Sequence, residues 1–382
     1  MLAALLDEAV RRGDVPFAVA MVADRDGVLW QGAAGSASAG RAAGPDTVVQ
    51  LWSLSKAVGA LMAMIVIERG LLTLDTPVVS VLGEFAQIKV VEEIGPDGPV
   101  LREPSRPVTL RHLLTHTSGL AYDTWDAKQA AYQAATGGER IGTGRKSSWF
   151  QPLMFDPGTA FTYGIGAEWA ALMVSVADGR PIDRFCQEEI FAPLGMADTA
   201  FEPDGRRDRL AQLKARDGDG AFTDHALAPP PHPEVYGMGS ALYGTTADYV
   251  RLMRLVLRRG ELDGARLISS ETAELMFANQ IGAVSVPRMP SNLPVISEDM
   301  DWFPETRKTW TAGFMRVEDD VEGRRRAGSL SWAGLVNTHY WIDPASGIAA
   351  ALVTQLLPMC DSRCMAVFDT FERAVYREIR RP

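Results

Sequence analysis

The longest uninterrupted apolar stretch of the chain covers residues 57–67 and predicts a buried helix. Only Ala, Val, Gly, Leu, Met and Ile occur in it, so a helix here would be apolar on every face. Such a helix belongs in the interior of a sizeable protein. Gly70 follows at the position where glycine commonly ends a helix.

The N-terminal pattern predicts an amphipathic helix followed by a β-hairpin. Residues 1–10 lack a basic start, and acids interrupt their apolar stretch, which favours a helix over a signal peptide. The β-rich runs 18–23 and 28–32 then flank a turn ending in Gly27. Since no apolar run reaches the roughly 18 residues of a membrane span, we expect a cytoplasmic protein without membrane contact.

The pattern changes in the middle of the chain and again after residue 245. From about 75 to 240, helical stretches alternate with Pro- and Gly-rich segments, and strand signals are scarce. Residues 109–114 resemble a capped helix, and Pro181 begins another. A helix over 247–258 precedes three antiparallel strands at 330–334, 339–343 and 348–353, and a last helix is expected over about 365–380.

These elements predict an α+β fold with one composite sheet. The N- and C-terminal strands would pair in an antiparallel sheet flanked by the terminal helices. Residues 1–75 and 245–382 would form this domain, and residues 76–244 a mainly helical inserted domain. The active site would lie in the cleft between the two.

Composition narrows the classes of function. The 382 residues are 47% hydrophobic and 23% charged, with a net charge of -10 and a pI of about 5.1. Without a basic stripe, nucleic acid is an unexpected partner. Cys186, Cys360 and Cys364 are too few and odd in number for a disulfide framework, so we expect plain thiols.

Ser53 and Lys56 are the first candidates for chemistry. Three positions apart, they share one face of the helix that begins here. A serine is a poor nucleophile until a base takes its proton, and a desolvated lysine can be that base. The alternative is an N-capping serine followed by a solvated lysine. The buried helix directly after the pair favours the chemical interpretation.

Four stretches carry a resemblance to a known family. They are residues 53–56 (SLSK), 113–120 (LLTHTSGL), 155–163 (FDPGTAFTY) and 332–334 (WAG). In this order they resemble the serine β-lactamase-like family, in its class C branch with the related family VIII carboxylesterases. The resemblance covers nearly the whole chain.

The resemblance implies roles for individual residues. Ser53 matches the acylated nucleophile, Lys56 its hydrogen-bonded partner and Tyr163 the second catalytic motif. Either Lys56 or Tyr163 could accept the serine proton. Trp332, Gly334 and Leu335 match the substrate-binding strand, and the N–H groups of Ser53 and Leu335 would form the oxyanion hole.

Two departures from the lactamase pattern point to the substrate. Ile165 stands where the lactamases carry an asparagine, and Trp332 stands where they carry a lysine. A site without an amide partner and without a cation should hold penicillins and cephalosporins poorly. Neutral esters with apolar groups suit it better.

We therefore predict a serine hydrolase that cleaves short- to medium-chain carboxylic esters. The alternatives are an acyltransferase or a small-amide or β-lactam hydrolase on the same fold, and, from another class, a non-catalytic ligand sensor or scaffold. No cofactor or metal is expected, because Leu113 stands between His112 and His116 where a zinc peptidase has glutamate. The oligomeric state stays open.

Overall fold

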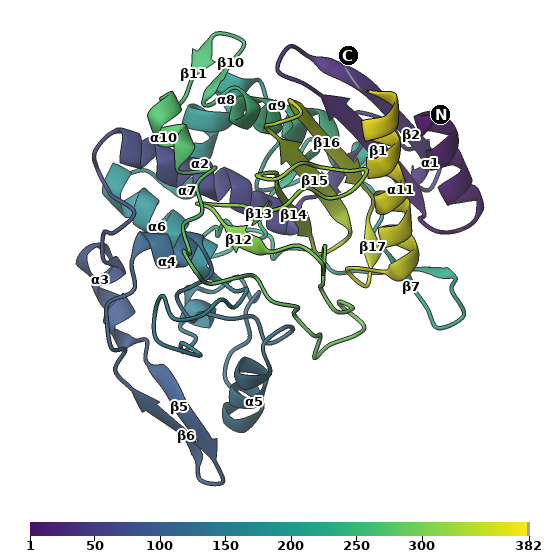
Figure 1. Ribbon diagram of the computed structural model, residues 1–382. Helices are drawn as coiled ribbons and strands as arrows, with labels where there is room; N and C mark the ends of the chain where they lie inside the picture. The colour runs from purple at the N-terminus through teal and green to yellow at the C-terminus, as the bar shows by residue number, and fades with distance from the viewer. Residues whose placement is uncertain (380–382) are drawn as a thin grey trace.

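The computed structural model describes residues 1–379, and an eight-stranded antiparallel sheet lies at its centre (Figure 1). In spatial order the strands are β12 (Lys308–Trp310), β13 (Met315–Val317), β14 (Leu330–Gly334), β15 (Thr338–Asp343), β16 (Ile348–Val353), β1 (Phe17–Ala23), β2 (Val28–Ser38) and β3 (Arg41–Ala42). The five C-terminal strands and the three N-terminal strands join in one sheet through the antiparallel pair of β16 and β1, and every pair of neighbouring strands in this sheet is antiparallel, as the sequence predicted. The α+β class is confirmed.

Helices cover both faces of the sheet. The helices α1 (Leu2–Arg11) and α11 (Ser362–Glu378) pack against each other on one face, where Ala18, Ala20 and Val22 point toward them. The other face packs against α9 (Thr246–Leu257) and α2 (Ser55–Glu68). The alternation along β1 follows from the two-residue period of a strand, and it gives the molecule two separate cores.

The helix α2 lies in the larger core, as its apolar sequence predicted. Every residue from Ser55 to Val66 is buried, and the helix packs against α6 (Gly166–Asp178) and α7 (Ile182–Cys186). Gly70 follows its end in the left-handed conformation (φ = +69°). The prediction of a fully buried helix at this place is confirmed.

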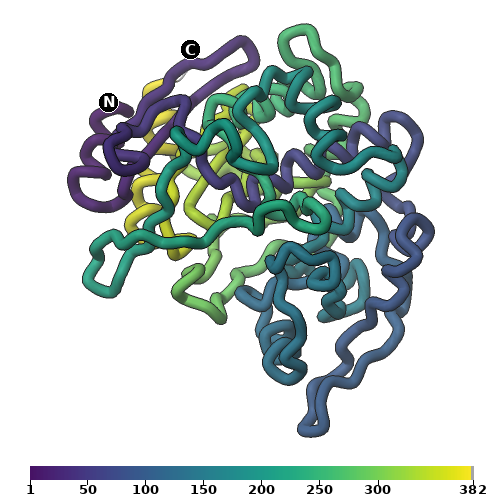
Figure 2. The backbone as a smooth tube through the Cα atoms, turned by 180° about the vertical axis from the view of Figure 1, so that it is seen from behind, coloured from purple at the N-terminus to yellow at the C-terminus, as the bar shows by residue number. Residues whose placement is uncertain are grey.

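The middle region contains mostly short helices joined by long loops, and it also contains small sheets. The hairpin of β5 (Val90–Gly95) and β6 (Gly98–Arg102) projects away from the central sheet in both views (Figures 1 and 2). Its strands are half exposed and carry little apolar alternation, so the amino-acid pattern did not predict them. The division into two domains stays a prediction.

The remaining elements are short. The helices are α3 (Val78–Val81), α4 (Leu110–Leu114), α5 (Ala127–Thr136), α8 (Ala192–Leu194) and α10 (Ser270–Glu274), with 3₁₀ turns at Trp52–Leu54, Gly83–Gln87, Lys146–Trp149 and Arg207–Arg209 and one π turn at Gln187–Phe191. The strand pairs are β4 (Val48–Gln50) with β9 (Tyr243–Thr245), β10 (Glu261–Leu262) with β11 (Ala265–Arg266), and β7 (Lys214–Arg216) with both β8 (Phe222–Asp224) and β17 (Leu356–Leu357).

Several local predictions are confirmed. Thr109 caps α4 through a capping box with His112, Pro181 precedes α7, and the three late strands pair in the expected order. The last helix begins at Ser362, three residues earlier than expected, and its expected end at Arg380 lies outside the described residues. Over residues 1–379, no helix has both the length and the apolar character that crossing a bilayer requires.

Candidate active site

Ser53 lies in a short 3₁₀ turn immediately before α2, rather than inside the first turn of that helix. The preceding Trp52 is held at φ = +48°, a conformation that is costly for a bulky residue. Its indole donates a hydrogen bond to Gln50 Oε1 (2.8 Å), and the backbone N–H of Gln50 donates to Gln355 Oε1 (3.0 Å). The turn that contains Ser53 is therefore held in place by hydrogen bonds through Gln50 to Gln355.

The three residues that the sequence singled out are brought together. Tyr163 Oη donates a hydrogen bond of 2.6 Å to Ser53 Oγ, and Lys56 Nζ donates one of 3.1 Å to the same oxygen. Tyr163 and Lys56 are buried, whereas Ser53 is partly exposed. A proton acceptor within hydrogen-bond reach of a reachable hydroxyl is the geometry that an acyl-transfer nucleophile needs.

Lys56 is surrounded by neutral oxygens. Besides Ser53 Oγ, its ammonium donates to the Tyr122 hydroxyl (3.2 Å) and to the carbonyl oxygen of Gly239 (2.9 Å). It also lies 4.9 Å from the centre of the Tyr163 ring. Over residues 1–379, no carboxylate lies within 4 Å of this ammonium. Its charge is solvated by the protein without being neutralised by a direct ion pair.

Tyr122 and Gly239 were missed by the sequence analysis. Tyr122 follows two residues after the 113–120 stretch, so its position next to a motif was the available signal. Burial raises the pKa of its phenol well above the ordinary value, which keeps it a neutral hydrogen-bonding hydroxyl. Gly239 contributes a backbone carbonyl, and no side-chain pattern could have pointed to it.

Trp332 contacts both the hydroxyl group and the ring of Tyr163. Its indole N–H donates to Tyr163 Oη (2.9 Å), and the two rings are 4.8 Å apart. Trp332 is only 3% exposed, so its indole ring is turned into the protein. This hydrogen bond was not predicted from the sequence. The role of Trp332 in substrate binding stays a prediction.

Other aromatic rings complete the wall behind Tyr163. Trp302 packs edge-on against Trp332, with ring centres 4.8 Å apart. Trp310 packs against the same indole, with ring centres 4.7 Å apart. It is 1% exposed in β12 and donates a hydrogen bond to the carbonyl of Leu114.

The strand β14 passes very close to the Ser53 turn. A Cβ placed on Gly334 would lie 2.5 Å from the carbonyl oxygen of Leu51 and 2.2 Å from Thr338 Oγ1. Only glycine permits this approach, which brings Leu335 beside the nucleophile turn. The assignment of Gly334 and Leu335 to the substrate site stays a prediction.

His112 and His116 are occupied in other ways. The Nδ1 atom of His112 accepts a hydrogen bond from the N–H of Thr109 in the capping box of α4. Burial and two nearby arginines lower the pKa of His112 to about 4. His116 is buried under Tyr163, with ring centres 4.8 Å apart. His112 therefore caps a helix, and His116 packs behind Tyr163.

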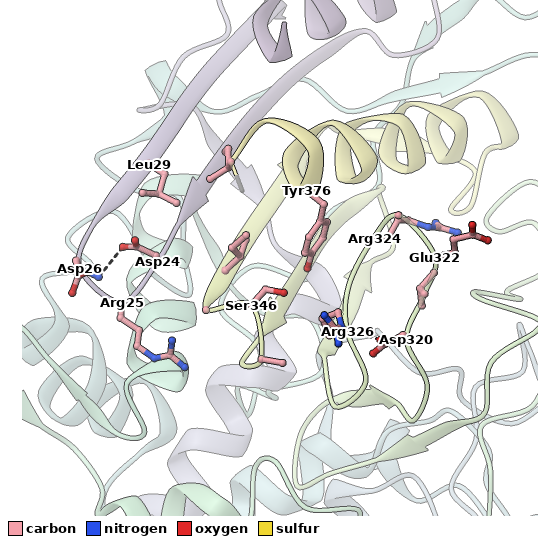
Figure 3. A pocket seen from close by; sticks show the side chains of 16 residues that line it. Asp24, Arg25, Asp26, Leu29, Asp320, Glu322, Arg324, Arg326, Ser346 and Tyr376 are labelled. Carbon is pink, nitrogen blue, oxygen red and sulfur yellow. Dashed lines mark hydrogen bonds and ion pairs between the residues drawn. The ribbon is translucent and has the colours of Figure 1, made fainter. Parts of the chain in front are cut away.

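A cavity of about 700 Å³ lies elsewhere, at the turn end of the sheet (Figure 3). Its walls come from the β1–β2 turn, the β15–β16 turn and the loop around residues 320–326. Acidic and basic side chains both line it, and none of the residues predicted for catalysis does. We therefore place the candidate site at Ser53 on chemistry rather than on cavity size.

Comparison with known proteins agrees with this geometry. A family model described as Beta-lactamase matches residues 2–366. The chain belongs to the beta-lactamase family. Within it, the chain is 31% identical to the monacolin J acid methylbutanoyltransferase of Aspergillus terreus, over 87% of this chain and 83% of the relative. It is 29% identical to a lovastatin esterase of Penicillium rubens, over 87% of this chain and 86% of the relative.

A solved structure extends the similarity to three dimensions. The unliganded simvastatin synthase of Aspergillus terreus matches with a TM-score of 0.83 and 28% identity, over 99% of this chain and 97% of that one. The protein thus has the fold of the serine hydrolases and acyltransferases of the beta-lactamase family. The relatives in this comparison are enzymes named for small-molecule acyl substrates.

Proposed function

We propose that this protein is a serine acyltransferase that moves a small acyl group from an ester donor to the hydroxyl of an apolar acceptor. The transferases among the relatives support acyl transfer better than the simple ester hydrolysis that the sequence first predicted. Hydrolysis is the second candidate, because a lovastatin esterase is nearly as similar. Both reactions share the same acyl-enzyme.

The observation that carries the proposal is the hydrogen-bonded set of Ser53, Lys56 and Tyr163. Ser53 Oγ attacks the acyl carbonyl carbon while its proton passes to the Lys56–Tyr163 pair. The bond from this carbon to the donor oxygen breaks, and the pair returns the proton to the leaving alcohol. The acceptor hydroxyl then repeats these steps in reverse and restores Ser53.

The surroundings of the nucleophile favour an apolar acceptor. Leu227 and Ile296 cluster with Trp52 and Leu335, the neighbours of Ser53 and Gly334 in the chain, and all four are only partly buried. Apolar groups beside the nucleophile turn favour an apolar partner over free water. The backbone N–H groups of Ser53 and Leu335 would hold the oxyanion that forms on the acyl carbonyl.

The test is the partition of one acyl-enzyme between two acceptors. The protein is given p-nitrophenyl butanoate with increasing cyclohexanol, and cyclohexyl butanoate and butanoate are both quantified. We expect the ester product to exceed butanoate at millimolar alcohol, and Ser53→Ala to lose both products. Butanoate alone at every alcohol concentration would make the protein a hydrolase. A burst without turnover would make it a sensor, and faster turnover of a chromogenic cephalosporin would make it a lactamase.

A further inference from the structure

Glu168 is a buried carboxylic acid that the reaction scheme above does not use. It lies in the first turn of α6, is 5% exposed, and its Oε2 atom has no hydrogen-bond partner among the described residues. Leaving a buried polar atom unpaired is costly, and such atoms in native proteins are few. Its retention beside the candidate site therefore calls for an explanation.

The Glu168 carboxyl group and the Lys56 ammonium are both next to Gly239. A Cβ placed on Gly239 would be 1.9 Å from Glu168 Oε1, so the carboxyl group is pressed against the backbone of this glycine. The carbonyl of the same residue accepts the 2.9 Å hydrogen bond from Lys56. Glu168 and Lys56 thus both contact Gly239, the first next to its Cα atom and the second at its carbonyl oxygen.

We propose that Glu168 is a positioning residue whose negative charge stabilises the Lys56–Tyr163 pair when the pair takes up the Ser53 proton. Whichever of the two accepts it, the pair carries one more positive charge from the attack of Ser53 until the proton passes to the leaving alcohol. A carboxylate just beyond contact favours that charge without forming an ion pair that would fix Lys56. The inference rests on the proposed function.

The charge of Glu168 depends on pH in the neutral range. Burial raises its pKa to about 7, and the nearby Lys56 charge works in the opposite direction. The titratable groups that face it are Lys56 on α2 and Tyr122 in the segment after α4, whose pKa the Glu168 charge helps to raise. The carboxyl is neutral below about pH 7 and ionised above it, so its effect on the pair is expected only at the higher pH.

The experiment measures how fast a fluorophosphonate labels Ser53 between pH 5.5 and 9, followed by intact mass. In this step the serine oxygen forms a bond to phosphorus, fluoride leaves, and the Lys56–Tyr163 pair takes the serine proton. For Glu168→Gln, which keeps the shape and loses the charge, we expect the wild-type rate at pH 5.5. At pH 9 we expect it to be roughly tenfold slower than wild type, the size of one nearby charge in a protein interior.

Two further variants separate charge from shape. Glu168→Asp keeps a carboxylate and should recover part of the rate at pH 9. The matched control is Asp248→Asn, which removes a buried acid from the first turn of α9, where it binds Thr199 and the Asp198 N–H instead. The ratio of the Asp248→Asn labelling rate to the wild-type labelling rate should be the same at every pH.

The outcomes distinguish this inference from the proposed function. If Glu168→Gln and wild type gave parallel profiles, Glu168 would be a purely structural residue and the inference would be overturned alone. If the wild-type protein were not labelled on Ser53 at all, the proposed function would fail and the inference with it.

Discussion

Lys56 and Arg325 are both buried cations, but the protein holds them in opposite ways. Arg325 is 1% exposed and pairs directly with Glu372, its Nε and Nη2 atoms donating to the two carboxylate oxygens at 2.7 and 3.0 Å. Lys56 donates to three neutral oxygens instead, and Glu168, the carboxylate that acts on it, stays beyond direct contact.

The difference separates a structural charge from a chemical one. A buried cation in a tight bidentate pair is fixed in place, and Arg325 in this way ties the loop before β14 to α11. A cation held by neutral oxygens alone leaves no partner charge stranded in direct contact when it is removed. Breaking each arrangement should therefore damage a different property of the protein.

The largest expected effect comes from Lys56→Met, which removes the ammonium and keeps an apolar chain of similar length. We expect kcat for ester turnover to fall by about 10³- to 10⁴-fold, the upper range for a general base. The thermal midpoint should stay close to that of wild type, because no buried counter-charge is left in direct contact. Steady-state kinetics and a thermal melt on the same preparation measure both. A much lower thermal midpoint with an unchanged kcat would make Lys56 a structural residue.

At Arg325 we expect a loss of stability without a loss of activity. Glu372→Gln keeps the shape of the side chain but leaves the Arg325 charge buried and unpaired, so unfolding should become easier by about 3–5 kcal/mol. Urea unfolding measures this loss, and kcat of the folded protein should not change. The control is Asp204→Asn, which breaks an exposed pair with Arg207 and should cost under about 1 kcal/mol. Equal losses in the two variants would contradict the comparison.

How far the sequence predicted the site depends on what each residue contributes. Residue type and spacing made Ser53 and Lys56 candidates, and the family resemblance added Tyr163. The structure brings the three side chains together, and their catalytic role stays a prediction. The helix after Ser53 was predicted because a helix without a polar face has to be buried. The paired N- and C-terminal strands were predicted for a similar reason, since each carried a strong β-rich run.

What the sequence could not show depends on contacts across the fold. Gly239 acts through its carbonyl, which every residue type possesses, and Glu168 is defined by its burial against that glycine. The donation from Trp332 to Tyr163 joins residues 169 positions apart. The hairpin β5–β6 was missed because its exposed strands lack the alternation that a half-buried strand shows.

The smallest expected effect concerns the neutral hydrogen bonds that hold the Lys56 site together. Trp332→Phe keeps a ring against Tyr163 and removes the indole N–H that donates to its hydroxyl. Loss of one such bond is worth about 0.5–1.5 kcal/mol, so kcat should fall roughly three- to tenfold. Because the indole is buried behind Tyr163, KM should stay unchanged. A raised KM with an unchanged kcat would instead support the substrate-binding role that the sequence predicted. In that case the neighbouring Trp302 would have to move for Trp332 to reach the substrate.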